Sequence, residues 1–212
     1  MLAKLQYISQ GNTFSEQEYN VRNALDHGAG WVQVRWKNAP VFQHTALASA
    51  VKKWCESYRA VCIINDSVTI AKTVDADGVH LGLADDSILE ARAQLDPGKL
   101  IGGTANSFAD VVQRIDERCD YIGLGPFRFT TTKEHLSPLL GLEGYQQIIE
   151  ALKKEFRAVP PIYAIGGIEI EDIECIRSAG VHGVALSRCI TQQPQLISSI
   201  HKILHNNVAN WR

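Results

Sequence analysis

Eight short apolar segments alternate with longer amphipathic segments along the whole chain. The apolar segments cover residues 4–9, 31–36, 60–65, 78–82, 100–104, 120–125, 161–167 and 183–187. The amphipathic segments cover residues 15–28, 39–58, 87–95, 107–116, 142–155, 169–180 and 193–205. Strands that alternate with helices predict a parallel sheet with helical crossovers. Because no low-complexity stretch or Pro-rich linker interrupts the pattern, we predict one domain over residues 1–212.

The second apolar segment decides how this sheet closes. An open, doubly wound sheet is covered by helices on both faces, so its strands are apolar on both sides. Residues 31–37, WVQVRWK, instead place three polar residues on one face: Gln33, Arg35 and Lys37. A polar face fits the upper interior of a barrel, and no G-x-G-x-x-G motif follows the first segment. We therefore predict an α/β fold, a (β/α)8 TIM barrel.

Several amphipathic segments carry the residues typical of helix ends. Ser15 and Ser107 stand where an N-cap is expected, and Gly28 and Gly180 stand where a helix would end. These four positions support the helical interpretation of the segments.

Polar residues and glycines gather where the predicted strands end. In (β/α)8 barrels, functional groups lie at the C-terminal ends of the strands. The candidates in this position are Gln33, Arg35, Lys37, Asn65, Asp66, Asp85, Thr104, Thr130, Thr132, Lys133, Gly166, Gly167, Ser187 and Arg188. The sequence therefore predicts a polar site at this end of the barrel.

Two carboxylates in this set have two interpretations. Asp66, and one of Asp85 and Asp86, would cap the helices that follow them, since Asp is a favoured N-cap. Alternatively, Asp66 and Asp85 would share a divalent cation at the tips of adjacent strands. Oxygen ligands without a nearby Cys or His cluster favour Mg²⁺ that holds substrate phosphates.

The remaining candidates suit phosphate groups. Gly166 and Gly167 leave backbone N–H groups exposed before a helix, and Ser187 follows the next strand, which together predict a monophosphate site. Three cationic side chains face the predicted metal site: Arg35, Lys37 and Lys133. They suit a departing diphosphate, whose growing charge they would stabilise.

Composition excludes other classes. A net charge of −2 argues against a nucleic-acid binder, and no segment approaches membrane-spanning length. Five scattered cysteines without a C-x-x-C pair predict reduced thiols in a cytoplasmic protein. We expect His80 to be buried and bonded, and the other histidines, His44 included, to be structural or solvated. Only His135 remains a candidate acid or base.

The motifs VQVRWK, IIND, GVHLGLADD, IGGT, GPFRFTTTK, AIGGI and GVALS occur in this order from about residue 5 to residue 190. In this ordered set the chain resembles the thiamine phosphate synthase family. The resemblance implies a (β/α)8 barrel and a transferase that joins a hydroxymethylpyrimidine diphosphate to a thiazole phosphate. It also implies release of diphosphate, a requirement for Mg²⁺, and a dissociative mechanism in which diphosphate leaves before the thiazole nitrogen attacks.

The resemblance also implies a role for each matching residue. Lys133, Arg35 and Lys37 would be catalytic, and Asp66 and Asp85 would bind Mg²⁺. The residues implied to hold the pyrimidine diphosphate are Gln33, Arg35, Lys37, Asn65, Thr104 and Lys133. Those implied to hold the thiazole phosphate are Thr130, Thr132, Gly167, Leu186 and Ser187.

Three departures from the family pattern stand near this site. Thr104 replaces a usual Ser, Leu83 replaces a common Gln, and Arg128-Phe129 replaces an aromatic-Pro pair. Because proline restricts the backbone, we expect the loop at residues 128–129 to be less rigid than in the family.

Two other functions stay open at this point. The thiazole tautomerase branch of the same barrel family would need a proton-transfer base, for which His135 is the candidate. A non-catalytic barrel would bind a phosphorylated metabolite without Mg²⁺ dependence. The partners expected are small-molecule substrates, with neither nucleic acid nor membrane, and the oligomeric state is open, a homodimer included.

Overall fold

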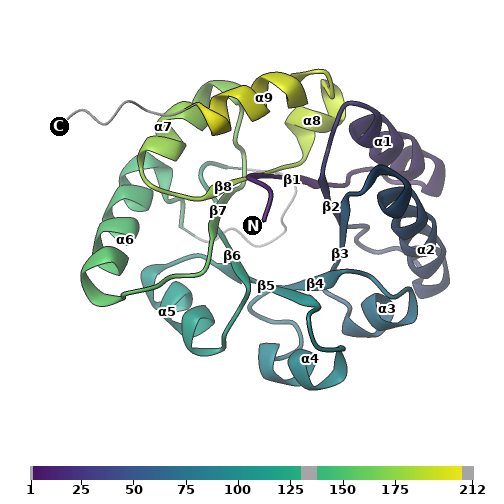
Figure 1. The fold of residues 1–212 in the computed structure, drawn as a ribbon, viewed down its shortest axis with the longest axis horizontal. Helices are drawn as coiled ribbons and strands as arrows, with labels where there is room; N and C mark the ends of the chain where they lie inside the picture. Colours follow the sequence, from purple (N-terminus) through teal and green to yellow (C-terminus); the bar gives the residue numbers. More distant parts are fainter. Residues whose placement is uncertain (1, 130–137, 207–212) are drawn as a thin grey trace.

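The strands of this protein form one closed parallel barrel in chain order (Figure 1). The computed structural model describes residues 2–129 and 138–206. The strands are β1 (Leu5–Ile8), β2 (Trp31–Val34), β3 (Val61–Asn65), β4 (Gly78–Leu81), β5 (Leu100–Ala105), β6 (Tyr121–Leu124), β7 (Ile162–Ile165) and β8 (Gly183–Leu186). The predicted (β/α)8 barrel is confirmed; that residues 1–212 form a single domain stays a prediction.

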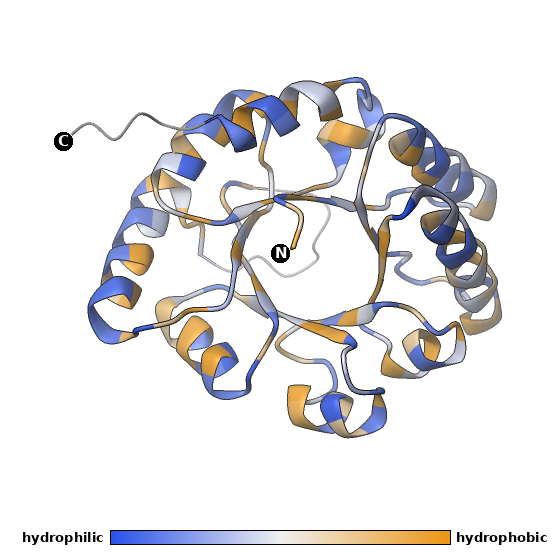
Figure 2. Cartoon of the chain, viewed as in Figure 1, coloured by the Kyte–Doolittle hydropathy of each residue, from blue (hydrophilic) through white to orange (hydrophobic). Residues whose placement is uncertain are grey.

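Helices surround this ring of strands. They are α1 (Phe14–Asp26), α2 (Val41–Tyr58), α3 (Val68–Thr73), α4 (Ile88–Gln94), α5 (Phe108–Asp116), α6 (Gly141–Glu155), α7 (Ile173–Ser178), α8 (Arg188–Gln192) and α9 (Leu196–His205), with a 3₁₀ turn η1 (Ile170–Asp172). Figure 2 shows that these helices carry both hydrophobic and hydrophilic residues, as expected of helices that cover a barrel. None of the described helices combines the length and hydropathy that a membrane span requires.

The helix ends confirm one predicted cap and correct another. Ser107 caps α5, because its hydroxyl accepts a hydrogen bond from the Asp110 N–H at 3.2 Å. The prediction for Ser15 is wrong, since α1 already begins at Phe14. Thr13 has the extended backbone that an N-cap needs, and its Oγ1 accepts from the Glu16 N–H at 3.2 Å.

Aromatic side chains fill the N-terminal half of the barrel. The ring of Trp31 meets the rings of Tyr121 and Tyr163 edge to face, with centroids 4.8 and 5.0 Å apart. Residues 2 and 3 pack against this cluster from below, and the Tyr163 hydroxyl donates to the Ala3 carbonyl at 2.8 Å. The barrel is therefore closed at this end, and its C-terminal end is left to hold a site.

A glycine on β5 makes room for the central ring. A Cβ added to Gly102 would lie 2.1 Å from Cζ of Tyr121, far inside van der Waals contact. Strand glycine is unfavourable for its conformational entropy, and here it allows the close approach of an aromatic side chain.

We expect Gly102→Ala to lower the free energy of unfolding by about 1–3 kcal/mol, because overpacking forces the Tyr121 ring or the strands to shift. Gly30→Ala is the matched control, since an added Cβ there meets no atom within 4 Å. Urea unfolding of both variants measures the difference. A change at Gly102 within about 0.5 kcal/mol of the control would contradict this account of the packing.

Candidate functional site

Of the predicted polar face of residues 31–37, only Gln33 belongs to β2, and its side chain is buried in the barrel; Arg35 and Lys37 follow the end of the strand. Gln33 lies two residues after the interior Trp31 and is only 2% exposed. The backbone of Arg35 is held by β1 and α1. Its N–H donates to Ser9 Oγ at 2.9 Å, and its carbonyl accepts from Gln17 Nε2 at 3.1 Å. These bonds fix the position of the Arg35 backbone directly after β2.

The structure shows that Asp66 does not cap the helix after β3. Ser67 is the N-cap of α3, and its hydroxyl accepts from the Ile70 N–H at 3.2 Å. Asp66 instead has left-handed backbone (φ 65°), held by a 2.9 Å bond from its N–H to the His80 carbonyl. That conformation is uncommon for a residue with a side chain, and it indicates a constrained position.

Asp85 and Asp86 do not cap the next helix either. Ser87 is the N-cap of α4, with its hydroxyl accepting from the Glu90 N–H at 3.3 Å. The Asp85 carboxylate turns back toward β4, where Oδ2 accepts from the Gly82 N–H at 2.6 Å. The cap interpretation of all three aspartates is therefore wrong, because a serine in each loop occupies the cap position.

The Asp66 and Asp85 carboxylates lie close enough to interact. Burial, followed by the hydrogen bond and charge of Asp85, raises the pKa of Asp66 to about 6, while Lys37 and Arg35 act in the opposite direction. The structure thus brings together four of the predicted residues from three strand ends. Two ionised carboxylates this close repel each other unless a proton or a cation lies between them. Their oxygens are the ligands that a hard divalent cation prefers.

The site has too few protein ligands to enclose a metal ion. Within residues 2–129 and 138–206, no group of three or more His, Cys, Asp or Glu residues could hold one. A cation at Asp66 and Asp85 would therefore complete its shell with water and with substrate oxygens, as Mg²⁺ commonly does.

A buried hydrogen-bond network crosses the barrel beneath these charges. The Tyr121 hydroxyl lies 3.4 Å from Gln6 Nε2 and 3.2 Å from His80 Nδ1. The other ring nitrogen of His80 lies 3.0 Å from Thr104 Oγ1. The expectation that His80 is buried and bonded is confirmed, since it is 5% exposed. Through His80, the network holds the predicted substrate residue Thr104.

The turn after β7 is held from the neighbouring loop by Arg128. This guanidinium binds both carboxylate oxygens of Asp172, at 2.7 and 2.8 Å, and lies 3.3 Å from the Gly167 carbonyl. A Cβ on Gly167 would lie 2.6 Å from Cγ of Arg128, so only glycine fits (φ 67°). The Asp172 ion pair holds the Arg128 side chain against this turn, and the lower rigidity expected of residues 128–129 stays a prediction.

Ser187 stands level with this turn. Ile165 pairs with Ala185 in the β7–β8 register, so Gly167 and Ser187 leave neighbouring strands at the same height. The Ser187 hydroxyl oxygen is buried and has no hydrogen-bond partner within the described part of the chain. Leu186 is buried beside it. A buried hydroxyl without a partner is costly in a finished core and is expected where a ligand binds.

A cavity of about 290 Å³ opens beside the carboxylates. It is lined by Trp36, Lys37, Asn38, Ala39, His44, Asn65, Asp66 and Ser67. Three of these were predicted as site residues, and His44 was not. No spacing pattern pointed to His44, because its position on α2 acquires meaning only once the ends of β2 and β3 lie next to it.

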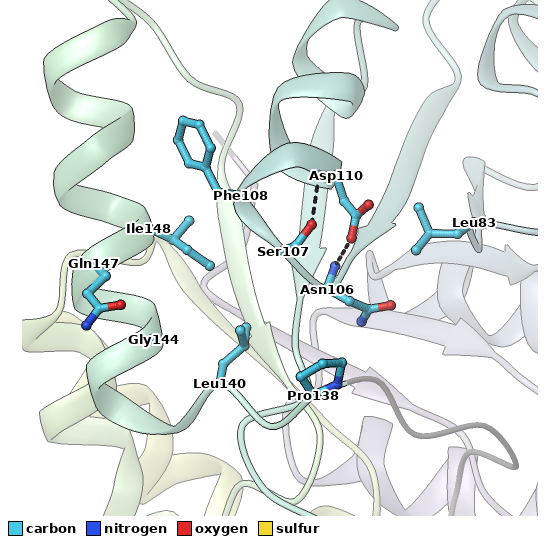
Figure 3. A pocket seen from close by; sticks show the side chains of 10 residues that line it. All are labelled: Leu83, Asn106, Ser107, Phe108, Asp110, Pro138, Leu140, Gly144, Gln147 and Ile148. Atoms are coloured by element: carbon cyan, nitrogen blue, oxygen red, sulfur yellow. Dashed lines mark hydrogen bonds between the residues drawn. The ribbon is translucent and has the colours of Figure 1, made fainter.

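Figure 3 shows a different cavity, of about 490 Å³, between α5 and α6. Its lining is largely apolar, with Phe108, Leu140 and Ile148 facing the space. None of the predicted site residues that the structure describes lines it. An apolar cavity does not suit a diphosphate, so we assign the candidate site to the barrel mouth.

Part of the predicted site falls on residues 130–137, outside the described residues. Thr130, Thr132, Lys133 and the candidate base His135 are among them. Their roles stay predictions.

Comparison with known proteins agrees with the geometry. The model of the family described as thiamine monophosphate synthase matches residues 6–190. A relative from Flavobacterium psychrophilum, named thiamine-phosphate synthase, is 53% identical and covers 96% of this chain and 100% of its own. One from Flavobacterium johnsoniae with the same name is 49% identical, with 98% and 99% covered. Among solved structures, thiamine phosphate pyrophosphorylase from Pyrococcus furiosus superposes with a TM-score of 0.81 at 27% identity, covering 96% and 97%.

The Asp66–Asp85 pair predicts how stability depends on pH. An acid whose pKa is raised on folding stabilises the fold fully below its unfolded pKa and loses this contribution as the pH rises through the folded value of about 6. Without divalent cations, the unsubstituted chain should therefore lose stability relative to Asp66→Asn between about pH 4 and about pH 6. Urea unfolding in the presence of a chelator measures this difference, and a difference that stays constant with pH would contradict the pairing.

Proposed function

Because the chain belongs to the thiamine monophosphate synthase family, we propose that its barrel mouth joins a hydroxymethylpyrimidine diphosphate to a thiazole phosphate, giving thiamine phosphate and diphosphate. The chain is then a transferase, in agreement with the names of its relatives. The observation that carries the proposal is the Asp66–Asp85 pair facing Arg35 and Lys37, because that arrangement suits a metal-bound diphosphate.

The diphosphate half of the site comes from β2 to β6. Arg35 and Lys37 would bind the diphosphate oxygens, together with Lys133 from the loop after β6. The other residues proposed to hold this substrate are Gln33, Asn65 and Thr104. Asp66 and Asp85 would hold Mg²⁺, which when bound would neutralise part of the diphosphate charge.

These residues suit a dissociative reaction. The bond between the pyrimidine methylene carbon and the diphosphate oxygen breaks, and its electron pair leaves with the diphosphate. The thiazole nitrogen then donates its lone pair to the resulting pyrimidinylmethyl cation, forming the new C–N bond. Arg35, Lys37 and Lys133 would stabilise the charge that grows on the leaving group, which lowers the barrier to its departure.

The thiazole phosphate would bind between β7 and β8. The backbone N–H groups near Gly167 and Leu186 and the hydroxyl of Ser187 would donate to the phosphate oxygens, and Thr130 and Thr132 would reach the thiazole ring. The unpartnered Ser187 hydroxyl supports this subsite. Arg128 and Asp172 would act as positioning residues for the Gly167 turn.

We also propose that the reaction takes place in the cytoplasm. Support comes from the cysteines, all five of which are free, and four of which are buried. Reduced thiols are typical of that compartment.

The direct test mixes the purified chain with the pyrimidine diphosphate and the thiazole phosphate, with Mg²⁺ or with a chelator. Mass spectrometry should detect thiamine phosphate only when Mg²⁺ is present. Asp66→Asn should form product more slowly and respond less to added Mg²⁺. Binding of both substrates without product would contradict the proposal and favour a tautomerase or a non-catalytic barrel.

Ser187→Ala separates phosphate binding from the chemistry. Losing one hydrogen bond to a charged group costs about 1.5–3 kcal/mol, so KM for the thiazole phosphate should rise by at least about tenfold while kcat changes little. Stability should not fall, because the hydroxyl bonds nothing in the described structure. Steady-state kinetics and urea unfolding check the two parts, and an unchanged KM would remove Ser187 from the subsite.

A further inference from the structure

His44 lies in the first turns of α2, beside the predicted metal site. Its backbone N–H donates to the Pro40 carbonyl at 3.0 Å, which fixes the start of the helix. The residue lines the cavity of about 290 Å³ that Lys37, Asn65 and Asp66 also line. Its Nε2 is buried from solvent and has no hydrogen-bond partner within the described residues. A buried polar atom without a partner, on a residue that borders the same cavity as three site residues, indicates a contact that a bound ligand completes.

The environment of the ring decides what Nε2 can bind. The ring forms a hydrogen bond with the backbone of Val34, which favours a proton on the imidazole. A carbonyl only accepts, so the nitrogen that faces it carries the N–H. Burial lowers the pKa of His44, which keeps the ring neutral at neutral pH. In the neutral ring, the other nitrogen has a lone pair and accepts hydrogen bonds.

This chemistry excludes several partners for Nε2. A diphosphate oxygen that carries no proton cannot donate to it, and neither can a carboxylate. A water molecule bound to a divalent cation donates strongly, and Mg²⁺ at a site with few protein ligands keeps several waters. Asp66, in the same cavity, is the proposed ligand of that cation.

We propose that His44 accepts a hydrogen bond from a water molecule on the cation held at Asp66, and that it thereby positions the hydration shell of the metal. The inference rests on the proposed function, because it requires a cation at the aspartates. His44 is a positioning residue in this account, since it acts on the reactants through metal-bound water.

Two substitutions separate this role from a structural one. His44→Asn keeps a short side-chain amide that can donate to the Val34 carbonyl but removes the Nε2 position. His44→Gln places an amide where Nε2 lies but gives up the bond to Val34. His27→Asn is the control, because His27 is exposed at the end of α1.

Mn²⁺ serves as the probe, and its free concentration is followed by electron paramagnetic resonance in the presence of inorganic diphosphate. Outer-shell partners of a metal typically contribute 10–100-fold to its affinity, so His44→Asn should weaken Mn²⁺ binding by about tenfold or more. His44→Gln and His27→Asn should bind Mn²⁺ almost as the unsubstituted chain does. Urea unfolding checks that all variants keep their fold.

The opposite order would overturn the inference. If His44→Asn binds Mn²⁺ normally and His44→Gln does not, the ring only fastens α2 to β2. If the affinity for diphosphate falls while the affinity for Mn²⁺ is unchanged, His44 acts on Lys37 or on the diphosphate and not on metal-bound water. If the unsubstituted chain fails to bind Mn²⁺ with diphosphate, the proposed metal site is wrong and this inference is wrong with it.

Discussion

The packing of Tyr121 in the centre of the barrel is the constraint on which the rest of the structure depends. Its ring occupies the space that Gly102 leaves open and meets Trp31 edge to face, so the N-terminal half of the interior is filled with aromatic carbon. Its hydroxyl points the other way and lies 3.2 Å from the ring of His80. One side chain therefore forms the boundary between an apolar floor and a polar chamber, and the strand ends above it are free to carry charge.

The charged groups above that boundary balance one another. Asp66 and Asp85 interact at one side of the mouth, and Lys37 and Arg35 offset part of their repulsion. The left-handed backbone of Asp66 and the Gly82 bond to Asp85 hold the carboxylates in place before any ligand arrives. A site arranged in advance loses little free energy to reorganisation when charge develops on a bound substrate.

The barrel could be predicted from the sequence because its evidence is local. Alternating segments and the polar face of residues 31–37 require only neighbours along the chain. Helix caps were less predictable, since they depend on where the backbone leaves its extended conformation, and Ser67 rather than Asp66 stands at that point. Candidate site residues were identifiable where they follow strands. His44 was missed because its surroundings are created jointly by β2, β3 and α2, which are distant in the sequence. The close approach of Gly102 to Tyr121 is also a tertiary contact, and no pattern of neighbouring residues predicts it.

The ion pair between Arg128 and Asp172 couples the evolution of two segments that are distant in the sequence. Arg128 lies in the loop after β6 and Asp172 lies in η1, and the Arg128 side chain also occupies the space beside Gly167. A mutation that places an aromatic residue at position 128 leaves the carboxylate of Asp172 without its guanidinium, and a change at position 172 leaves the guanidinium without its carboxylate. The loop after β6 and η1 should therefore be inherited as a unit, and a chimera built from relatives needs both from the same parent.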